Sequence, residues 1–138
     1  MSIKLIVMDM DGTLLDEDHA TIPQRNIDAL RAASMRGVKL ALASGRTWSL
    51  LVGAQEQLGC LDYALLANGA SVWDVAAGKS IYENTIPNDL ALAIGEVLHR
   101  EGLAFEVYCD GQGYVRASDR DRILEDSLSP SLTQFLDA

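Results

Sequence analysis

The stretch IKLIVMDMDGTLL, residues 3–15, decides the fold of this chain. Residues 3–8 form a nearly continuous apolar run, which favours a strand buried on both faces of a parallel sheet. Such a strand delivers Asp9 to its carboxyl end. Because Asp9 and Asp11 are two residues apart, both carboxylates are expected on the same side of the strand end or of the first loop residues.

The paired carboxylates suit phosphoryl transfer. One of the two carboxylates can attack phosphorus in its ionised form and give an acyl-phosphate that is open to water, while the other handles a proton. Gly12 lets the chain turn sharply, so that the backbone can approach a phosphate. An acidic turn, in which the carboxylates only bind local N–H groups, stays open as the alternative. A calcium loop of the EF-hand type is excluded, because Leu14 and Ala20 stand where that loop needs Gly and Glu.

Downstream of this stretch, helical and strand patterns alternate. Helices are expected at residues 21–37 and 47–59, and strands at residues 38–43 and 63–67. Thr21 is expected to cap the first helix. This order predicts right-handed crossovers and an open α/β sheet. Asp9, Ser44 and Asn68 each follow a strand end, so we expect them at the edge where such sheets place ligands.

A second unit is predicted after a hairpin at residues 70–84, because Pro87 marks a break. Its expected elements are a helix at 88–102, strands at 103–109 and 114–117, a charged helix from 118, and a break at 129–130 before an apolar segment at 132–136. The predicted domains are therefore residues 1–86 and residues 87–138.

The loop after the second strand carries Ser44, Gly45 and Arg46. A hydroxyl and a glycine-associated N–H just before a helix N-terminus form an anion site without needing net positive charge. Arg46 either approaches a phosphate or braces the loop, since a guanidinium offers a planar fork of donors. Ser-Gly-Arg is also common loop chemistry, and Asn68-Gly69 is equally compatible with a plain turn.

Residues 3–15 resemble motif I of the haloacid-dehalogenase superfamily, a hydrophobic strand followed by DxDGT and commonly by LL. The resemblance implies that Asp9 is the nucleophile and a magnesium ligand. It also implies that Asp11 is the general acid/base, that the backbone carbonyl of Asp11 binds Mg²⁺, and that Thr13 supports the loop. The expected activity is thus that of a magnesium-dependent phosphomonoester hydrolase.

The segment around Ser44 is similar to motif II of that superfamily, in which a hydroxyl and the following N–H bind the phosphate. Asn68-Gly69 is similar to a pair in the Cof-like branch. The resemblance implies a Rossmann-like core with three parallel strands, incomplete here, and the beginning of an α+β cap domain. The phosphate-binding residues that it implies are Ser44, Gly45, Arg46, Asn68, Gly12 and Thr13. The implied substrate is a small phosphorylated metabolite such as a sugar phosphate.

The chain departs from the family pattern in its second half. No Lys follows Lys79, and no Gly-Asp followed by a further Asp stands near the C-terminus, so the family's motifs III and IV are missing. We expect either a fragment of a longer protein or a truncated product with impaired activity. The alternative function is a non-catalytic fragment that binds phosphate weakly or self-associates. A dinucleotide-binding domain is disfavoured, because Asp9 and Asp11 stand in place of a glycine-rich turn.

Composition limits the partners of the chain. Eleven basic residues against twenty acidic ones give a net charge of −9, and the basic residues form no cluster, which argues against nucleic acid. The apolar run at the start lacks the features of a signal peptide, and no apolar stretch approaches the roughly 20 residues of a membrane span. Cys60 and Cys109 are expected to be free thiols in a cytoplasmic protein.

Three further side chains are weaker candidates for roles in the site. His19 and His99 have no Cys or carboxylate at ligand spacing, so solvent-facing or capping roles are favoured. Trp48 follows Arg46 closely and either walls the substrate entrance or packs in the core, of which packing is the commoner role.

Overall fold

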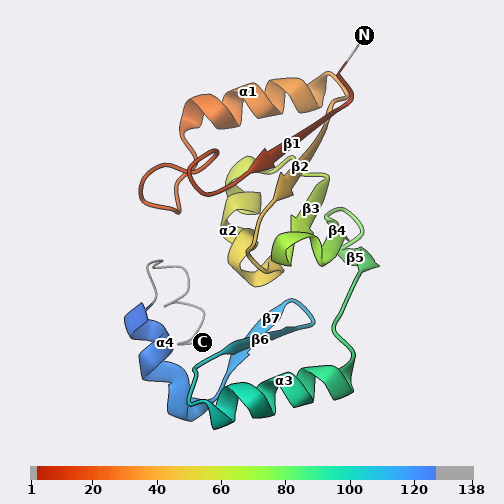
Figure 1. Cartoon of the computed structure of the whole chain (residues 1–138). Coiled ribbons are helices and arrows are strands. Elements are labelled where there is room, and N and C mark those ends of the chain that lie inside the picture. The colour runs from red at the N-terminus through yellow and green to blue at the C-terminus, as the bar shows by residue number, and fades with distance from the viewer. Residues whose placement is uncertain (1–2, 127–138) are drawn as a thin grey trace. The chain divides into compact units, whose positions relative to one another are not determined.

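The computed structural model describes residues 3–126 and divides the chain after Glu83 into two compact units, residues 1–83 and 84–138 (Figure 1). We call them the first and the second unit. The predicted break at residues 129–130 and the apolar segment at 132–136 lie outside the described residues. The assignment of the second unit as the beginning of a cap domain stays a prediction.

The first unit is built on a five-stranded sheet in the order β1-β2-β3-β4-β5. The strands are β1 (Leu5–Asp9), β2 (Lys39–Ala43), β3 (Tyr63–Leu66), β4 (Ser71–Asp74) and β5 (Lys79–Glu83). Strands β1, β2 and β3 are parallel, whereas β4 and β5 are antiparallel to their neighbours. The α/β class with three parallel strands is thus confirmed, and the predicted hairpin extends the same sheet.

Two helices, α1 (Gln24–Met35) and α2 (Trp48–Leu58), connect the parallel strands. Helix α1 packs on the face of the sheet that carries Ile6 and Met8, since those side chains line one hollow together with Leu30 of α1. Arg31 of α1 donates a 2.9 Å hydrogen bond to the carbonyl of Leu58 in α2. Gly59 ends α2 in the left-handed conformation, at φ 66°. The buried residues of these helices are Ile27, Leu30, Leu51, Ala54 and Leu58.

Strand β1 is not buried on both faces, which corrects the prediction from its apolar sequence. Leu5 and Val7 are 49% and 50% exposed, and they lie on the face opposite Ile6 and Met8. The reason is the placement of α1: it lies against the face that carries Ile6 and Met8, and Leu5 and Val7 lie on the opposite face. An apolar run in the sequence shows that a strand face can be buried, whereas the elements packed against that face determine whether it is buried.

The core of the first unit is one cluster of buried apolar residues that runs from Met10 to Leu66. Trp48 and Trp73 pack against it as a parallel stack, with ring centroids 5.0 Å apart and an interplanar angle of 4°. Trp48 therefore takes the predicted packing role. Both cysteines are free, as predicted, and burial raises the pKa of the Cys60 thiol.

The second unit contains a helix and a hairpin, as its sequence predicts. The elements are α3 (Asn88–Arg100), β6 (Glu106–Cys109), β7 (Gln112–Val115) and α4 (Arg120–Asp126). The hairpin turn is tighter than predicted, because Asp110 and Gly111 alone form it, at φ 50° and 77°. Arg116 lies 5.3 Å from the Phe105 ring centre and donates a 2.7 Å bond to Asp119, which is 5% exposed.

Within residues 3–126, helices are too short or too polar to cross a membrane.

Candidate functional site

The carboxyl end of β1 carries the two aspartates of the predicted motif. Asp9 is the last residue of β1 and is exposed, Met10 is only 1% exposed, and Asp11 follows as an exposed residue at the start of the turn. The N–H groups of Thr13, Leu14 and Leu15 all donate to the carbonyl of Met10, so the chain winds back at once. The buried Met10 thus fixes both carboxylates at one strand end.

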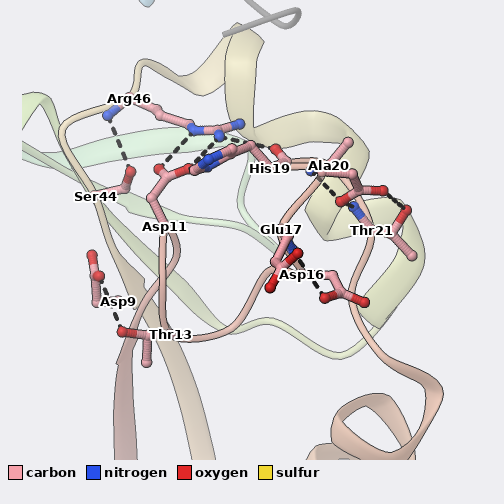
Figure 2. Close-up of polar contacts among 11 residues, drawn as sticks. Asp9, Asp11, Thr13, Asp16, Glu17, His19, Ala20, Thr21, Ser44 and Arg46 are labelled. Atoms are coloured by element: carbon pink, nitrogen blue, oxygen red, sulfur yellow. Dashed lines mark hydrogen bonds and ion pairs between the residues drawn. The ribbon is translucent and has the colours of Figure 1, made fainter. Parts of the chain in front are cut away.

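The turn after Asp11 depends on Gly12 and Thr13. Gly12 has a φ of +72°, a conformation that glycine adopts without cost, and this confirms the predicted sharp turn. The Thr13 hydroxyl donates to Asp9 Oδ2 at 3.3 Å (Figure 2). The other carboxylate oxygen of Asp9, Oδ1, takes no part in this contact.

Asp11 is held by Arg46 from the neighbouring loop. Arg46 Nη2 donates to Asp11 Oδ1 at 2.6 Å, and Arg46 Nε donates to Oδ2 at 3.1 Å. The Arg46 side chain is only 13% exposed, so this bidentate pair is partly shielded from water. The hydrogen bond from Arg46, aided by one from His19, lowers the pKa of Asp11. Arg46 thus braces Asp11 here, and its predicted approach to a phosphate stays a prediction.

The loop after β2 and the turn after β3 are joined by backbone hydrogen bonds. The Asn68 N–H donates to the carbonyl of Ser44 at 3.2 Å, and the Ala67 N–H donates to that of Arg46 at 3.0 Å. The Ser44 hydroxyl, in a residue that is 9% exposed, accepts the Arg46 N–H at 3.1 Å. Three loops after β1, β2 and β3 thus meet at one edge of the sheet.

Asn68 and Gly45 approach each other closely inside this arrangement. Asn68 adopts a left-handed conformation, at φ 56° and ψ 33°, which asparagine tolerates better than most residues. A Cβ atom at Gly45 would stand 3.0 Å from Asn68 Oδ1. Thr47 follows as the N-cap residue of α2, so the Ser44 loop leads directly into a helix N-terminus.

A loop that the sequence analysis left out of the site also reaches Asp11. His19 Nδ1 lies 3.1 Å from Asp11 Oδ1, and the His19 carbonyl accepts a 3.1 Å bond from Arg46 Nη2 (Figure 2). His19 was expected to face solvent or to cap a helix. Its spacing does not predict the contact, because seven residues of irregular chain lie between His19 and Asp11.

The His19 loop is shaped by Asp18, which corrects the predicted role of Thr21. Thr21 does not cap α1, whose N-cap residue is Pro23 without a side-chain hydrogen bond. Its hydroxyl donates instead to Asp18 Oδ2 at 2.5 Å, and the N–H groups of Ala20 and Thr21 donate to Oδ1. These bonds, that of the hydroxyl first, lower the pKa of Asp18 to about 2.

The structure therefore brings together all of the residues predicted for the site. Asp9, Asp11, Gly12, Thr13, Ser44, Gly45, Arg46 and Asn68 lie on three adjoining loops. Among residues 3–126, no group of three or more His, Cys, Asp or Glu side chains is placed to hold a metal ion. The described part of the chain thus offers two aspartates beside the Ser44 loop, without a complete side-chain cage for a metal ion.

Comparison with known proteins identifies the family to which this chain belongs. A sequence model described as haloacid dehalogenase-like hydrolase matches residues 6–134. The chain belongs to the haloacid dehalogenase-like hydrolase family. The resemblance inferred from the two motifs is thereby confirmed.

Relatives of this family member include phosphatases. Phosphatase YwpJ of Bacillus subtilis is 31% identical over 119 residues, which are 86% of this chain and 41% of that protein. From the same organism, 5-amino-6-(5-phospho-D-ribitylamino)uracil phosphatase YcsE is 39% identical over 74 residues, 54% of this chain and 29% of that protein.

A solved haloacid dehalogenase-like hydrolase from Bacteroides thetaiotaomicron matches with a TM-score of 0.76 and 28% identity, over 99% of this chain and 49% of that one. The chain spans less than half of each of these three proteins.

Proposed function

We propose that this chain carries the nucleophile and phosphate loop of a magnesium-dependent phosphomonoester hydrolase, which works through an aspartyl-phosphate on Asp9. The observation that supports it most is the meeting of Asp9, Asp11 and the Ser44 loop at one sheet edge. Membership of a family that contains phosphatases supports the same reaction class.

In the proposed first step, Asp9 attacks phosphorus, the bond from phosphorus to the ester oxygen breaks, and Asp11 gives a proton to the leaving oxygen. In the second step, water attacks the phosphorus of the aspartyl-phosphate and Asp11 takes back a proton, which releases phosphate and free Asp9. Both steps use the same pair of carboxylates, and the protons balance over the cycle.

Arg46 must loosen its hold on Asp11 for this cycle to run. Its guanidinium lowers the pKa of Asp11, which opposes the protonated form that donates a proton. A phosphate group beside Ser44 would offer the guanidinium another planar, anionic partner. We therefore propose that Arg46 exchanges Asp11 for the phosphate when substrate binds.

The phosphate would be bound mainly by uncharged donors. The Ser44 hydroxyl, the N–H of Gly45 and the Asn68 side chain lie at the loop that leads into α2, where the helix dipole favours an anion. Gly12 and Thr13 would keep the opposite wall of the site close to the phosphate. A net charge of −9 is thus no obstacle to an anionic substrate.

The aspartates fit a magnesium ion as part of a site. Mg²⁺ keeps several waters and binds through one or two carboxylates together with substrate phosphate, so it needs no cage of protein ligands. The carboxylate of Asp9 and the backbone carbonyl of Asp11 would hold it. Bound there, the ion would offset negative charge that develops on the phosphoryl group.

We propose a small phosphorylated metabolite, such as a sugar phosphate, as the substrate. One relative is named for a phosphatase of a phosphorylated ribityl compound, which combines a sugar-alcohol chain with a uracil ring. That relative matches this chain over 74 residues, so the likeness supports the class of substrate and not its identity.

Replacement of Asp9 by Asn tests the proposal. An amide cannot form the acyl-phosphate, so in a chain extended to the length of its relatives we expect magnesium-dependent hydrolysis of p-nitrophenyl phosphate to fall at least about a thousandfold, which corresponds to about 4 kcal/mol. Asp28→Asn, an equivalent change on the exposed part of α1, should leave the rate unchanged. Comparable turnover by the Asp9→Asn and wild-type proteins would place the nucleophile elsewhere.

A second candidate, a non-catalytic fragment that self-associates, is favoured by the edge of the sheet. Ile3, Leu5 and Val7 are 72%, 49% and 50% exposed along β1, and an unpaired apolar edge strand readily accepts another strand. Light scattering after gel filtration should then detect dimers or larger species, which Val7→Lys should dissociate. A monomer at high concentration would rule this candidate out.

A further inference from the structure

The contact between His19 and Asp11 is directional. Asp11 Oδ1 accepts Arg46 Nη2 at 2.6 Å and lies 3.1 Å from His19 Nδ1, whereas Oδ2 accepts only Arg46 Nε within this cluster, at 3.1 Å. An ionised carboxylate only accepts hydrogen bonds, so His19 Nδ1 must be the donor. One oxygen of Asp11 is thus held from two loops and the other from one.

The backbone of His19 is fixed in a conformation that presents the ring to Asp11. His19 has a φ of 55°, which is uncommon for residues other than glycine, although histidine and asparagine enter it more readily than most. The Asp18 turn holds the residues after His19, and Arg46 Nη2 binds its carbonyl at 3.1 Å. A less common conformation is retained where surrounding bonds determine it, and here they determine where the imidazole lies.

We propose that His19 is a positioning residue for Asp11, which anchors Oδ1 so that Oδ2 is the oxygen that exchanges a proton with the substrate. The inference rests on the proposed function of Asp11. When Arg46 turns to the phosphate it releases both Asp11 and the His19 carbonyl, so the Asp18 turn then holds the loop, and the bond from the His19 ring keeps Asp11 aimed at the leaving oxygen. Arg46 and His19 thus both bind the Asp11 carboxylate, and only Arg46 releases it when substrate binds.

A pair of substitutions separates this role from the shape of the loop. In His19→Asn the side-chain Nδ2 replaces the Nδ1 donor at the same distance from the backbone, and asparagine tolerates the positive φ. In His19→Gly the backbone conformation is again favourable, but the donor is gone. Both variants should keep the fold, which the two-dimensional amide spectrum and the melting temperature of each would verify.

The first measurement does not depend on turnover. In the 138-residue chain labelled with ¹³C at the aspartate side-chain carboxyl, the Asp11 signal identifies its hydrogen-bonded environment. We expect this signal to move and broaden in His19→Gly, and to stay near its wild-type position in His19→Asn. An Asp11 signal that is unchanged in His19→Gly would overturn the proposal, because the bond would then not hold the carboxylate.

The second measurement tests whether the hydrogen bond from His19 to Asp11 contributes to catalysis. His19→Gly should lower kcat for p-nitrophenyl phosphate about tenfold with KM within about twofold, and His19→Asn should recover most of kcat. A matched loss in both variants, or a change in KM alone, would contradict the positioning role. These kinetics use the protein extended to the length of its relatives, and absence of turnover there would count against the proposed function, whereas the carboxyl signal would still decide whether His19 positions Asp11.

Discussion

The two units use similar elements but differ in what those elements bury. In the first unit, helices and strands enclose a single cluster that extends from Met10 to Leu66. In the second unit, α3 has one apolar side and yet buries none of its residues, and Leu92 and Tyr114 are 71% and 58% exposed. Amphipathic patterning therefore shows which side of an element can be buried, whereas stability comes only where a second element covers it.

The largest effect is expected when one leucine in each unit is replaced by alanine. Leu40 in β2 is 0% exposed, so Leu40→Ala should lower the free energy of unfolding by about 2–5 kcal/mol through lost burial and a cavity. Leu92 in α3 is 71% exposed, and Leu92→Ala should change the free energy of unfolding by less than about 0.5 kcal/mol. Urea titration followed by circular dichroism measures both. Equal losses would mean that α3 is covered as fully as β2.

A smaller effect is expected where two loops of the first unit meet. Gly45→Ala places a methyl group 3.0 Å from Asn68 Oδ1 and should cost about 1 kcal/mol. Asn68→Gly should relieve this crowding, so a double-mutant cycle in urea should find the two positions coupled.

Gly53 provides the matched control for that cycle. A Cβ there meets nothing within 4 Å, and Gly53 lies inside α2, so Gly53→Ala should stabilise the protein by up to about 1 kcal/mol. If both alanine substitutions acted alike, the close approach of the two site loops would have no energetic consequence.

The smallest effect concerns acid and the Asp18 turn. The hydrogen bonds from Thr21 and Ala20 lower the pKa of Asp18 from 3.8 to about 2. A lowered pKa stabilises the folded chain above the ordinary value, and this contribution disappears as the pH falls from 3.8 through about 2. The melting temperature of wild type should therefore exceed that of Asp18→Asn by a constant amount near neutrality, and the difference should close across this window. A difference that persists unchanged at the acid end would contradict the assignment.

Much of the site could be predicted because its signals are local. Each apolar run ends at a polar residue, and parallel strands place their carboxyl ends at the same edge, so the meeting of Asp9, Ser44 and Asn68 followed from topology. The alternation of strand and helix patterns likewise fixed the order of elements in the first unit.

Other features depended on contacts that no local pattern encodes. Leu5 and Val7 are exposed because they lie on the face of β1 opposite α1, which the apolar run cannot reveal. The approach of His19 to Asp11 requires the Asp18 turn and the Arg46 fork together. Thr21 looked like a helix cap because it precedes Pro23, but its hydroxyl is closer to Asp18 than to any N–H of α1 that would need a cap.

The stacked indoles of Trp48 and Trp73 give the chain an optical label of its own. They are both of its tryptophans, so all of the tryptophan emission originates in the first unit. Two nearly parallel indoles at 5.0 Å are close enough for their electronic transitions to couple, and the coupled circular-dichroism band should vanish once β4 separates from α2. Tyr63 and Tyr82 lie in the first unit and Tyr108 and Tyr114 in the second, so tyrosine signals arise from both units, whereas the coupled band arises from the first unit alone. Loss of this band in an unlabelled sample can thus time the opening of the first unit by itself.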